Sequence, residues 1–319
     1  MKSLYRLFEV NTINHYLLTN SDYTERVDQL TGGPFYAKIE ALHHPEVSIF
    51  RRFVNQTIRE VGLLPEHTSA LNFHPSEHAY YLKGTYYGLG GISSILGGKH
   101  FETITQKNTT HYTIIINEQQ LHKYLAPDQI HQYQDFVQVK RDITSCEKLR
   151  YEIPAIIDRL FETLVSVDNN EVADNHYTAT VQEIFDNLLR LINAATFNRM
   201  RVNSNAYLLD KVVDAINDLE LPQISIFNLA NKLHTNRRNI ETAFRHYIQI
   251  SPKEYINNLR LNNIRVSLLE ATKNTARVST TARDYGIQHL SNFSKAYYRL
   301  FNEQPHETLA RNPLESTQH

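Results

Sequence analysis

The sequence predicts an α+β protein in which a strand-rich N-terminal part precedes a helical connector and an all-helical C-terminal part. Short apolar runs separated by turn residues fill most of residues 37–120, which is typical of strands. From Glu147 onward the apolar residues recur at helical spacing instead. The 319 residues are enough for two domains with separate cores.

The N-terminal part combines one expected helix with several expected strands. Residues 21–30 are predicted to form a short helix, because acidic residues stand near its start and Gly32-Gly33-Pro34 follows it. Strands are expected at residues 47–50, 69–73, 79–82 and 112–116. Six of the ten glycines fall within residues 84–98, which indicates tight turns and a compact sheet pair or barrel.

Two apolar stripes follow at helical spacing. One runs from Ile153 to Leu164, and the second lies on a helix expected to begin near Thr178. The polar residues 168–175 between them are expected to form a loop. Such stripes are most often internal packing surface; the alternative is that one of them forms a contact between two copies of the chain. Residues 203–205 look like the joint before the next helix.

The last third of the chain carries two helix-turn-helix patterns, in which two short apolar runs flank a polar or glycine turn. Runs this short are marginal as isolated helices, so each pair must bury a common face. The first pattern uses Leu229, Ala230, Ile240, Ala243 and Phe244, and the second uses Ala282, Gly286, Phe293, Ala296 and Tyr297.

One longer helix joins the two patterns. Ser251-Pro252-Lys253-Glu254 has the form of a capping box with proline at the first helical position. The helix that it opens runs to about Glu270, roughly 28 Å at 1.5 Å per residue. Because one turn of B-DNA is about 34 Å, we expect this strut to hold two helices against successive major grooves.

On these positions the last third of the chain resembles the AraC/XylS family of bacterial transcription regulators. The match continues through Arg260-Leu261-Asn262, Leu268-Leu269, Phe301 and Pro305. The chain departs from the family pattern at His234, Gln249 and Asn302, where glycine is usual. Ile287 also replaces a phenylalanine, and the aromatic-Arg pair after Pro305 is missing. Histidine and asparagine tolerate left-handed backbone better than glutamine does.

The resemblance implies that different segments of the chain form domains with different functions. It implies a regulatory cupin-like β-domain at residues 1–146 that senses a small-molecule effector, and a helical connector with a possible dimer contact at 147–203. A DNA-binding domain with two helix-turn-helix units follows at 204–312, and a tail at 313–319. The expected partners are double-stranded DNA, RNA polymerase and a second copy of the chain, without a cofactor or an enzymatic activity. The alternatives are a regulator that needs no ligand and a metal-dependent cupin-like enzyme fused to a DNA-binding module.

Outward-facing residues at the start of each second helix are the candidates for contacts with DNA. Arginine can bind guanine through two hydrogen bonds, glutamate accepts one from cytosine, and asparagine suits adenine. Base contacts are expected from Arg238, Glu241, Thr242, Ser291, Asn292 and Lys295, and phosphate contacts from Arg237, Arg245, Lys253 and Arg299. The competing interpretation is a solvated helix face.

Charge and cysteine content fit this expectation. From Pro222 onward 13 Lys and Arg face 7 Asp and Glu, a net charge of +6, whereas the preceding residues carry −7. The single cysteine, Cys146, excludes an internal disulfide framework. Neither a membrane span of about 20 apolar residues nor an apolar signal core is apparent, so a cytoplasmic protein is expected.

The remaining candidate sites lie in the strand-rich part. Four tyrosines, Tyr80, Tyr81, Tyr86 and Tyr87, are candidates for an effector pocket, with structural packing as the alternative. Residues 74–78 match the H-x-x-E-H pattern of some zinc peptidases. That chemistry needs a helix, and Pro75 with its strand-like flanks argues against one. No metal site is therefore predicted.

Overall fold

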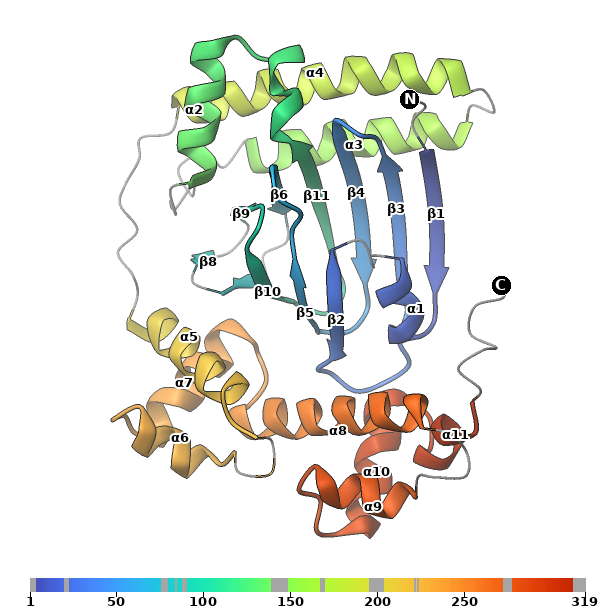
Figure 1. Cartoon of the computed structure of the whole chain (residues 1–319), viewed down its shortest axis with the longest axis vertical. Helices are drawn as coiled ribbons and strands as arrows, with labels where there is room; N and C mark the ends of the chain where they lie inside the picture. Colours follow the sequence, from blue (N-terminus) through green and yellow to red (C-terminus); the bar gives the residue numbers. More distant parts are fainter. Residues whose placement is uncertain are drawn as a thin grey trace.

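A computed structural model of the chain describes residues 4–19, 23–75, 80–83, 85–87, 91–138, 149–166, 170–194, 204–220, 222, 224–271 and 277–311. It confirms the α+β class (Figure 1). Antiparallel sheets form most of the N-terminal part, and the described secondary-structure elements from residue 149 onward are helices.

The described strands form two antiparallel sheets. The six-stranded sheet has the order β1 (Leu4–Val10), β3 (Ala37–His43), β4 (Val47–Val54), β11 (Thr109–Asn117), β6 (Thr68–His74) and β9 (Gly91–Leu96). The five-stranded sheet has the order β2 (Thr24–Gln29), β5 (Ile58–Leu63), β10 (His100–Thr105), β7 (Tyr80–Leu82) and β8 (Thr85–Tyr87). One apolar cluster joins both sheets to α1 (Ile13–Leu18).

The four expected strands are confirmed as β4, β6, β7 and β11, but the expected helix at 21–30 is wrong. Thr24–Gln29 is strand β2, which pairs antiparallel with β5. The acidic start and the glycine end resembled helix signals, yet pairing with β5 buries Val27 and gives the backbone a sheet partner. Tertiary pairing therefore overrode a weak local pattern.

Three helices cover one end of the six-stranded sheet (Figure 1). They are α2 (Pro127–Gln138), which follows the short helix η1 (Glu118–Lys123), and the long pair α3 (Leu149–Ser166) and α4 (Asn170–Ala194). Both expected stripes are buried in one cluster with residues of that sheet. Because α4 begins at Asn170, the expected polar loop at 168–175 is mostly helix, and α4 starts about two turns earlier than expected.

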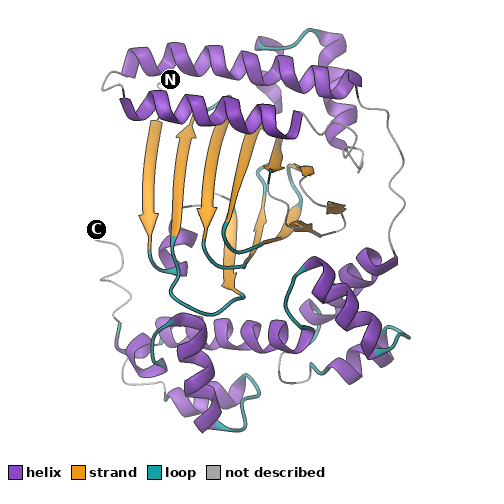
Figure 2. Ribbon diagram, turned by 180° about the vertical axis from the view of Figure 1, so that it is seen from behind, coloured by secondary structure: helices purple, strands orange, loops and turns teal. Residues whose placement is uncertain are grey.

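The C-terminal part consists of α5 (Ser204–Asn217), α6 (Ile226–Lys232), α7 (Arg237–Tyr247), α8 (Pro252–Glu270), α9 (Val278–Asp284), α10 (Leu290–Phe301) and α11 (Pro305–Ala310). Helix α8 runs beneath the sheets, with α6 and α7 at one end and α9 and α10 at the other (Figures 1 and 2). Ser225 caps α6, and the Ser251 hydroxyl caps α8 by accepting from the Glu254 N–H at 3.2 Å. Each helix pair buries the apolar residues that the sequence assigns to it.

Side-chain amides of α8 bind the free edge of strand β2. The Asn262 side chain accepts from the Gln29 N–H at 3.0 Å and donates to the Gln29 carbonyl at 2.8 Å. One turn earlier, Asn258 donates to the Leu30 carbonyl at 2.7 Å. These bonds take the place of a neighbouring strand, so the edge of the five-stranded sheet is covered by a helix of the C-terminal part.

Buried charges lie on the same seam between the sheets and the C-terminal helices. The Arg59 guanidinium lies 2.8 Å from Asp28 and 2.6 Å from Glu102, and it donates to Asn217 of α5 at 3.1 Å. Burial alone would lower the pKa of Arg59, but Tyr255 and the two carboxylates raise that pKa above its usual value. The guanidinium therefore stays charged and holds both carboxylates in place.

Three positions where glycine is usual in the resembled family adopt left-handed backbone. The φ angles are 48° at His234, 63° at Gln249 and 55° at Asn302. Gln249 follows the C-terminal cap of α7, and its N–H bonds the Phe244 carbonyl at 3.0 Å. The helix end thus has the geometry that glycine favours while carrying a residue with a Cβ atom.

We predict that Gln249→Gly stabilises the protein by about 1 kcal/mol. Relief of roughly 1–2 kcal/mol of left-handed strain outweighs the greater freedom of glycine in the unfolded chain. Denaturant unfolding measures the change. Gln249→Ala is the control, because alanine retains the Cβ atom and should give no comparable gain. An equal gain from both variants would contradict the role of backbone strain.

We predict that Arg59→Met destabilises the protein by about 3 kcal/mol, because it removes the buried cation that lies between Asp28 and Glu102. Asp28 keeps its ion pair with Arg26 and Glu102 keeps its hydrogen bond from Asn217, so the loss is at the lower end for a buried ion pair. Arg159→Met is the matched control, since Arg159 lies 2.7 Å from Glu183 in a pair whose side chains are 60% and 47% exposed. Removing that exposed pair should cost at most about 1 kcal/mol. Similar losses for the two variants in denaturant unfolding would show that the buried cluster is not special.

Candidate functional site

The outward face of α7 carries the first group of predicted contact residues. Arg238, Thr242 and Arg245 are exposed, whereas Ile240 and Phe244 of the same helix are fully buried. Arg237 donates to Glu241 at 2.8 Å, one turn further along the helix. The sequence therefore assigned the two faces of α7 correctly, but it did not show that two of the predicted contact residues pair with each other.

Helix α10 and the start of α8 carry the second group. Ser291, Asn292, Lys295 and Arg299 are exposed on α10, and Lys253 is exposed in the first turn of α8. Phe293 and Tyr297 point into the cluster formed by α8, α9 and α10. Every residue predicted to touch DNA is thus at least partly accessible to solvent. Lys253 lies on α8 itself, and the others lie on two helices at opposite ends of α8.

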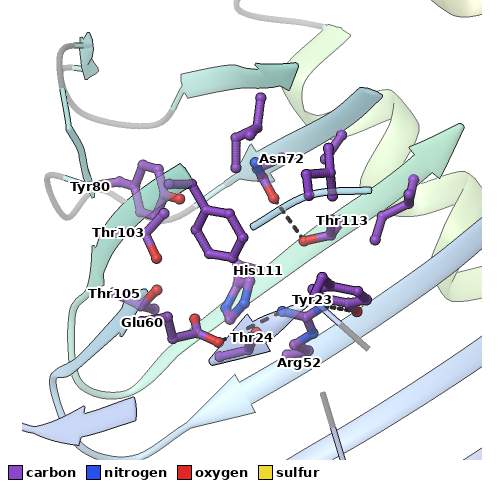
Figure 3. A pocket seen from close by; sticks show the side chains of 15 residues that line it. Tyr23, Thr24, Arg52, Glu60, Asn72, Tyr80, Thr103, Thr105, His111 and Thr113 are labelled. Atoms are coloured by element: carbon purple, nitrogen blue, oxygen red, sulfur yellow. Dashed lines mark hydrogen bonds and ion pairs between the residues drawn. The ribbon is translucent and has the colours of Figure 1, made fainter. Parts of the chain in front are cut away.

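A small cavity lies inside the strand-rich part (Figure 3). Its volume is about 30 Å³, and its polar lining comes from several strands of both sheets. Tyr80, one of the four tyrosines named as candidates for an effector pocket, lines the cavity. Tyr81 instead packs with the C-terminal helices, so it does not belong to this cavity. Tyr86 and Tyr87 lie on β8, and their side chains are outside the described part of the structure.

The cavity contains polar groups that the sequence analysis missed. They are Arg52, Asn72 and His111, which face inward from β4, β6 and β11. Only Asn72 lies within a predicted strand, where a polar residue among apolar ones could have identified it; Arg52 and His111 lie just beyond the predicted bounds. Within the described residues Arg52 Nε, Asn72 Nδ2 and His111 Nδ1 have no hydrogen-bond partner. Each such buried group is costly, so this wall is suited to contact a polar molecule.

Both buried histidines next to the cavity are neutral at physiological pH. Burial lowers the pKa of His74 to about 3, and burial with the nearby Arg52 charge lowers the pKa of His111 well below its usual value. The remaining charges are Arg52 and Glu60, whose closest atoms are 4.0 Å apart. The cavity wall therefore carries nearly balanced charge and many hydrogen-bonding groups.

Most of the zinc-peptidase pattern at residues 74–78 lies outside the described part of the structure. His74 ends strand β6, and residues 76–78 lie outside the described residues. Across the described residues no group of three or more His, Cys, Asp or Glu side chains is placed to hold a metal ion. No helix among them is long and apolar enough to span a membrane. Cys146 also falls outside the described ranges.

Comparisons with known proteins agree with the C-terminal geometry. A family model described as "Helix-turn-helix domain" matches residues 229–311. The chain is 28% identical over 158 residues to the XylDLEGF operon transcriptional activator 3 of Pseudomonas putida, a match that covers 48% of each protein. It is 29% identical over 135 residues to activator 2 of the same operon and organism, covering 42% of this chain and 83% of that protein.

The chain thus spans about half the length of the first of these relatives. Among solved structures, the AraC-like transcriptional activator CuxR aligns with 80% of this chain and 94% of its own, at 12% identity and a TM-score of 0.42. The helix-turn-helix match covers the residues that carry the sequence resemblance, and the aligned relatives are transcriptional activators by name. Residues 229–311 therefore contain a helix-turn-helix domain similar to that of the AraC/XylS regulators that the sequence resembles.

Proposed function

We propose that the protein is a sequence-specific DNA-binding transcription regulator. In this proposal residues 204–312 bind double-stranded DNA through two helix-turn-helix units, formed by α6 with α7 and by α9 with α10. The observation that carries the proposal is the placement of exposed polar and basic residues on α7 and α10, at the two ends of a 19-residue helix. At 1.5 Å per residue, α8 is roughly 28 Å long, close to one turn of DNA.

The proposed contacts differ between the two recognition helices, α7 and α10. On α7, Arg238 and Thr242 are free to reach base edges, while Glu241 must first leave its ion pair with Arg237. On α10, Ser291, Asn292 and Lys295 are the base-contact candidates. Phosphate contacts are assigned to Arg237, Arg245, Lys253 and Arg299, whose charges would fix the register without reading sequence.

We further propose that residues 1–146 form a cupin-like regulatory domain and that a small polar effector binds in its cavity. The proposal is supported by the inward polar atoms of Arg52, Asn72 and His111 that lack partners. In the present structure the cavity has room for one or two water molecules, so an effector of metabolite size has to widen it. An effector acts only if its affinity differs between two states of the protein.

We also propose that the regulator acts as a homodimer and contacts RNA polymerase. The apolar stripes of α3 and α4 are buried against each other and against the sheet. A dimer through residues 147–203 would therefore use the outer, polar faces of these helices. Sedimentation of the whole chain at tens of micromolar tests the dimer, and a single monomer boundary would remove it.

We predict that Arg238→Ala relaxes the base preference at one position of the bound site and costs about 1–3 kcal/mol on the specific sequence. Arg245→Ala, on the same helix, should weaken specific and random DNA alike and reduce the salt dependence of binding. The specific sequence is obtained by selection from random DNA, and affinities are measured at several salt concentrations. If both variants bind both kinds of DNA as the wild type does, the assigned contacts are wrong.

We predict that a metabolite bound in the cavity raises the melting temperature of the wild type but not of Ala70→Met. Ala70 lines the cavity and is only 2% exposed, so the longer side chain should fill the space that the ligand needs. A thermal-shift screen of small polar metabolites, tested one by one, measures the effect. Equal shifts for the wild type and the variant would place the ligand elsewhere.

A further inference from the structure

Two buried glutamines of the five-stranded sheet bind the C-terminal ends of α7 and α10. The Gln106 side-chain amide donates to the Tyr247 carbonyl, the last residue of α7, at 3.1 Å. The Gln29 side-chain amide donates to the Leu300 carbonyl, in the last turn of α10, at 2.7 Å. The two glutamines are 3% and 1% exposed.

These bonds provide donors for unpaired carbonyls at the C-terminal end of each helix. The last four carbonyls of an α-helix have no partner within the helix, so an outside donor caps them. At α10 the Gly33 N–H adds a second bond, to the Arg299 carbonyl at 2.9 Å. A Cβ atom at Gly32 would lie 2.6 Å from that carbonyl, so the loop after β2 approaches α10 as closely as glycine permits. The strand-rich part therefore completes the ends of both helices.

The two glutamines lie at the same end of one sheet. Strands β2 and β10 both pair antiparallel with β5, and Gln29 and Thr105 are both opposite Ile58. Gln106 follows Thr105, and the Thr57 hydroxyl donates to its side-chain oxygen at 3.4 Å. Neighbouring strands are about 4.8 Å apart, so the backbone positions that carry the glutamines are separated by only about two strand widths.

We propose that Gln29 and Gln106 are positioning residues that set the mutual placement of α7 and α10 from this one sheet end. The inference rests on the proposed DNA-binding function, in which these helices read the two halves of a site. Any change that shifts β2 relative to β10 moves one helix end relative to the other. A change in the conformation of the strand-rich part would thus change the distance between α7 and α10.

The test uses the whole chain with spin labels on both helices. His246→Cys and Tyr298→Cys place labels at exposed positions of α7 and α10 that carry no assigned DNA contact, and Cys146→Ser removes the native thiol. Pulsed electron resonance measures the distance distribution. We expect one narrow distribution in the labelled parent, and a broadened or displaced one in Gln106→Leu, in Gln29→Leu and most of all in the double variant.

Gln182→Leu is the matched control. Gln182 lies exposed on α4, where it donates to Asp186, far along the chain from either helix end. It should leave the distribution unchanged. Gln106→Leu is the cleaner of the two seam variants, because Gln29 also donates to two carbonyls of its own loop. A glutamine that only stabilises the fold would lower the melting temperature without changing the distance, and that result would overturn the proposal.

A second experiment tests the same placement of α7 and α10 by measuring DNA affinity as the spacing within the bound site is changed. In the selected sequence, one base pair is added or removed between the segments read by the two helices. The wild type should lose about tenfold or more in affinity, whereas the double variant should lose clearly less, since its helices are free to adjust. Equal losses would overturn the proposal. A wild type that selects no sequence would instead defeat the proposed function, while the label distances would still test the anchoring.

Discussion

The hydrogen-bonded seam between the five-stranded sheet and the C-terminal helices determines the arrangement of the whole molecule. The Asn262 side chain bonds both the N–H and the carbonyl of Gln29, as the backbone of a neighbouring strand would. The unpaired backbone groups at the edge of β2 and the buried side-chain amides of Asn258 and Asn262 would each be unfavourable alone, because unpaired buried polar groups are costly. They form hydrogen bonds with each other, and these bonds fix helix α8 to the strand-rich part.

The seam combines an apolar contact, in which Leu30, Tyr81 and Ile104 are buried with the C-terminal helices, with a group of buried charges. Arg59, Asp28 and Glu102 form its buried centre, and Asn217 of α5 bonds both Arg59 and Glu102. These buried groups are stable only in one arrangement, because moving the sheet away from the helices would leave several of them without a hydrogen-bonding partner at once. Interfaces of this kind between parts of one chain resemble transient protein contacts.

The exposed face of the molecule follows from the same arrangement. The apolar sides of α7 and α10 are buried with α5, α8 and α9, and their C-terminal ends are held by the sheet. The polar sides remain open to solvent and carry Arg237, Arg238, Arg245, Lys295 and Arg299. Folding therefore places the cavity inside the strand-rich part and leaves these basic side chains on outward helix faces that are suited to contact a polyanion.

The sequence by itself determined the C-terminal part, because its signals are local. Ser225 and Ser251 mark helix starts within one turn, and helical spacing separates buried Ile240 and Phe244 from exposed neighbours. Only the tertiary structure decided that residues 24–29 form a strand, that Arg52 faces a cavity, and that Gln29 caps a helix more than 250 residues away. Strand pairing, cavity walls and seams join residues that are distant in the chain, and no local pattern encodes their partners.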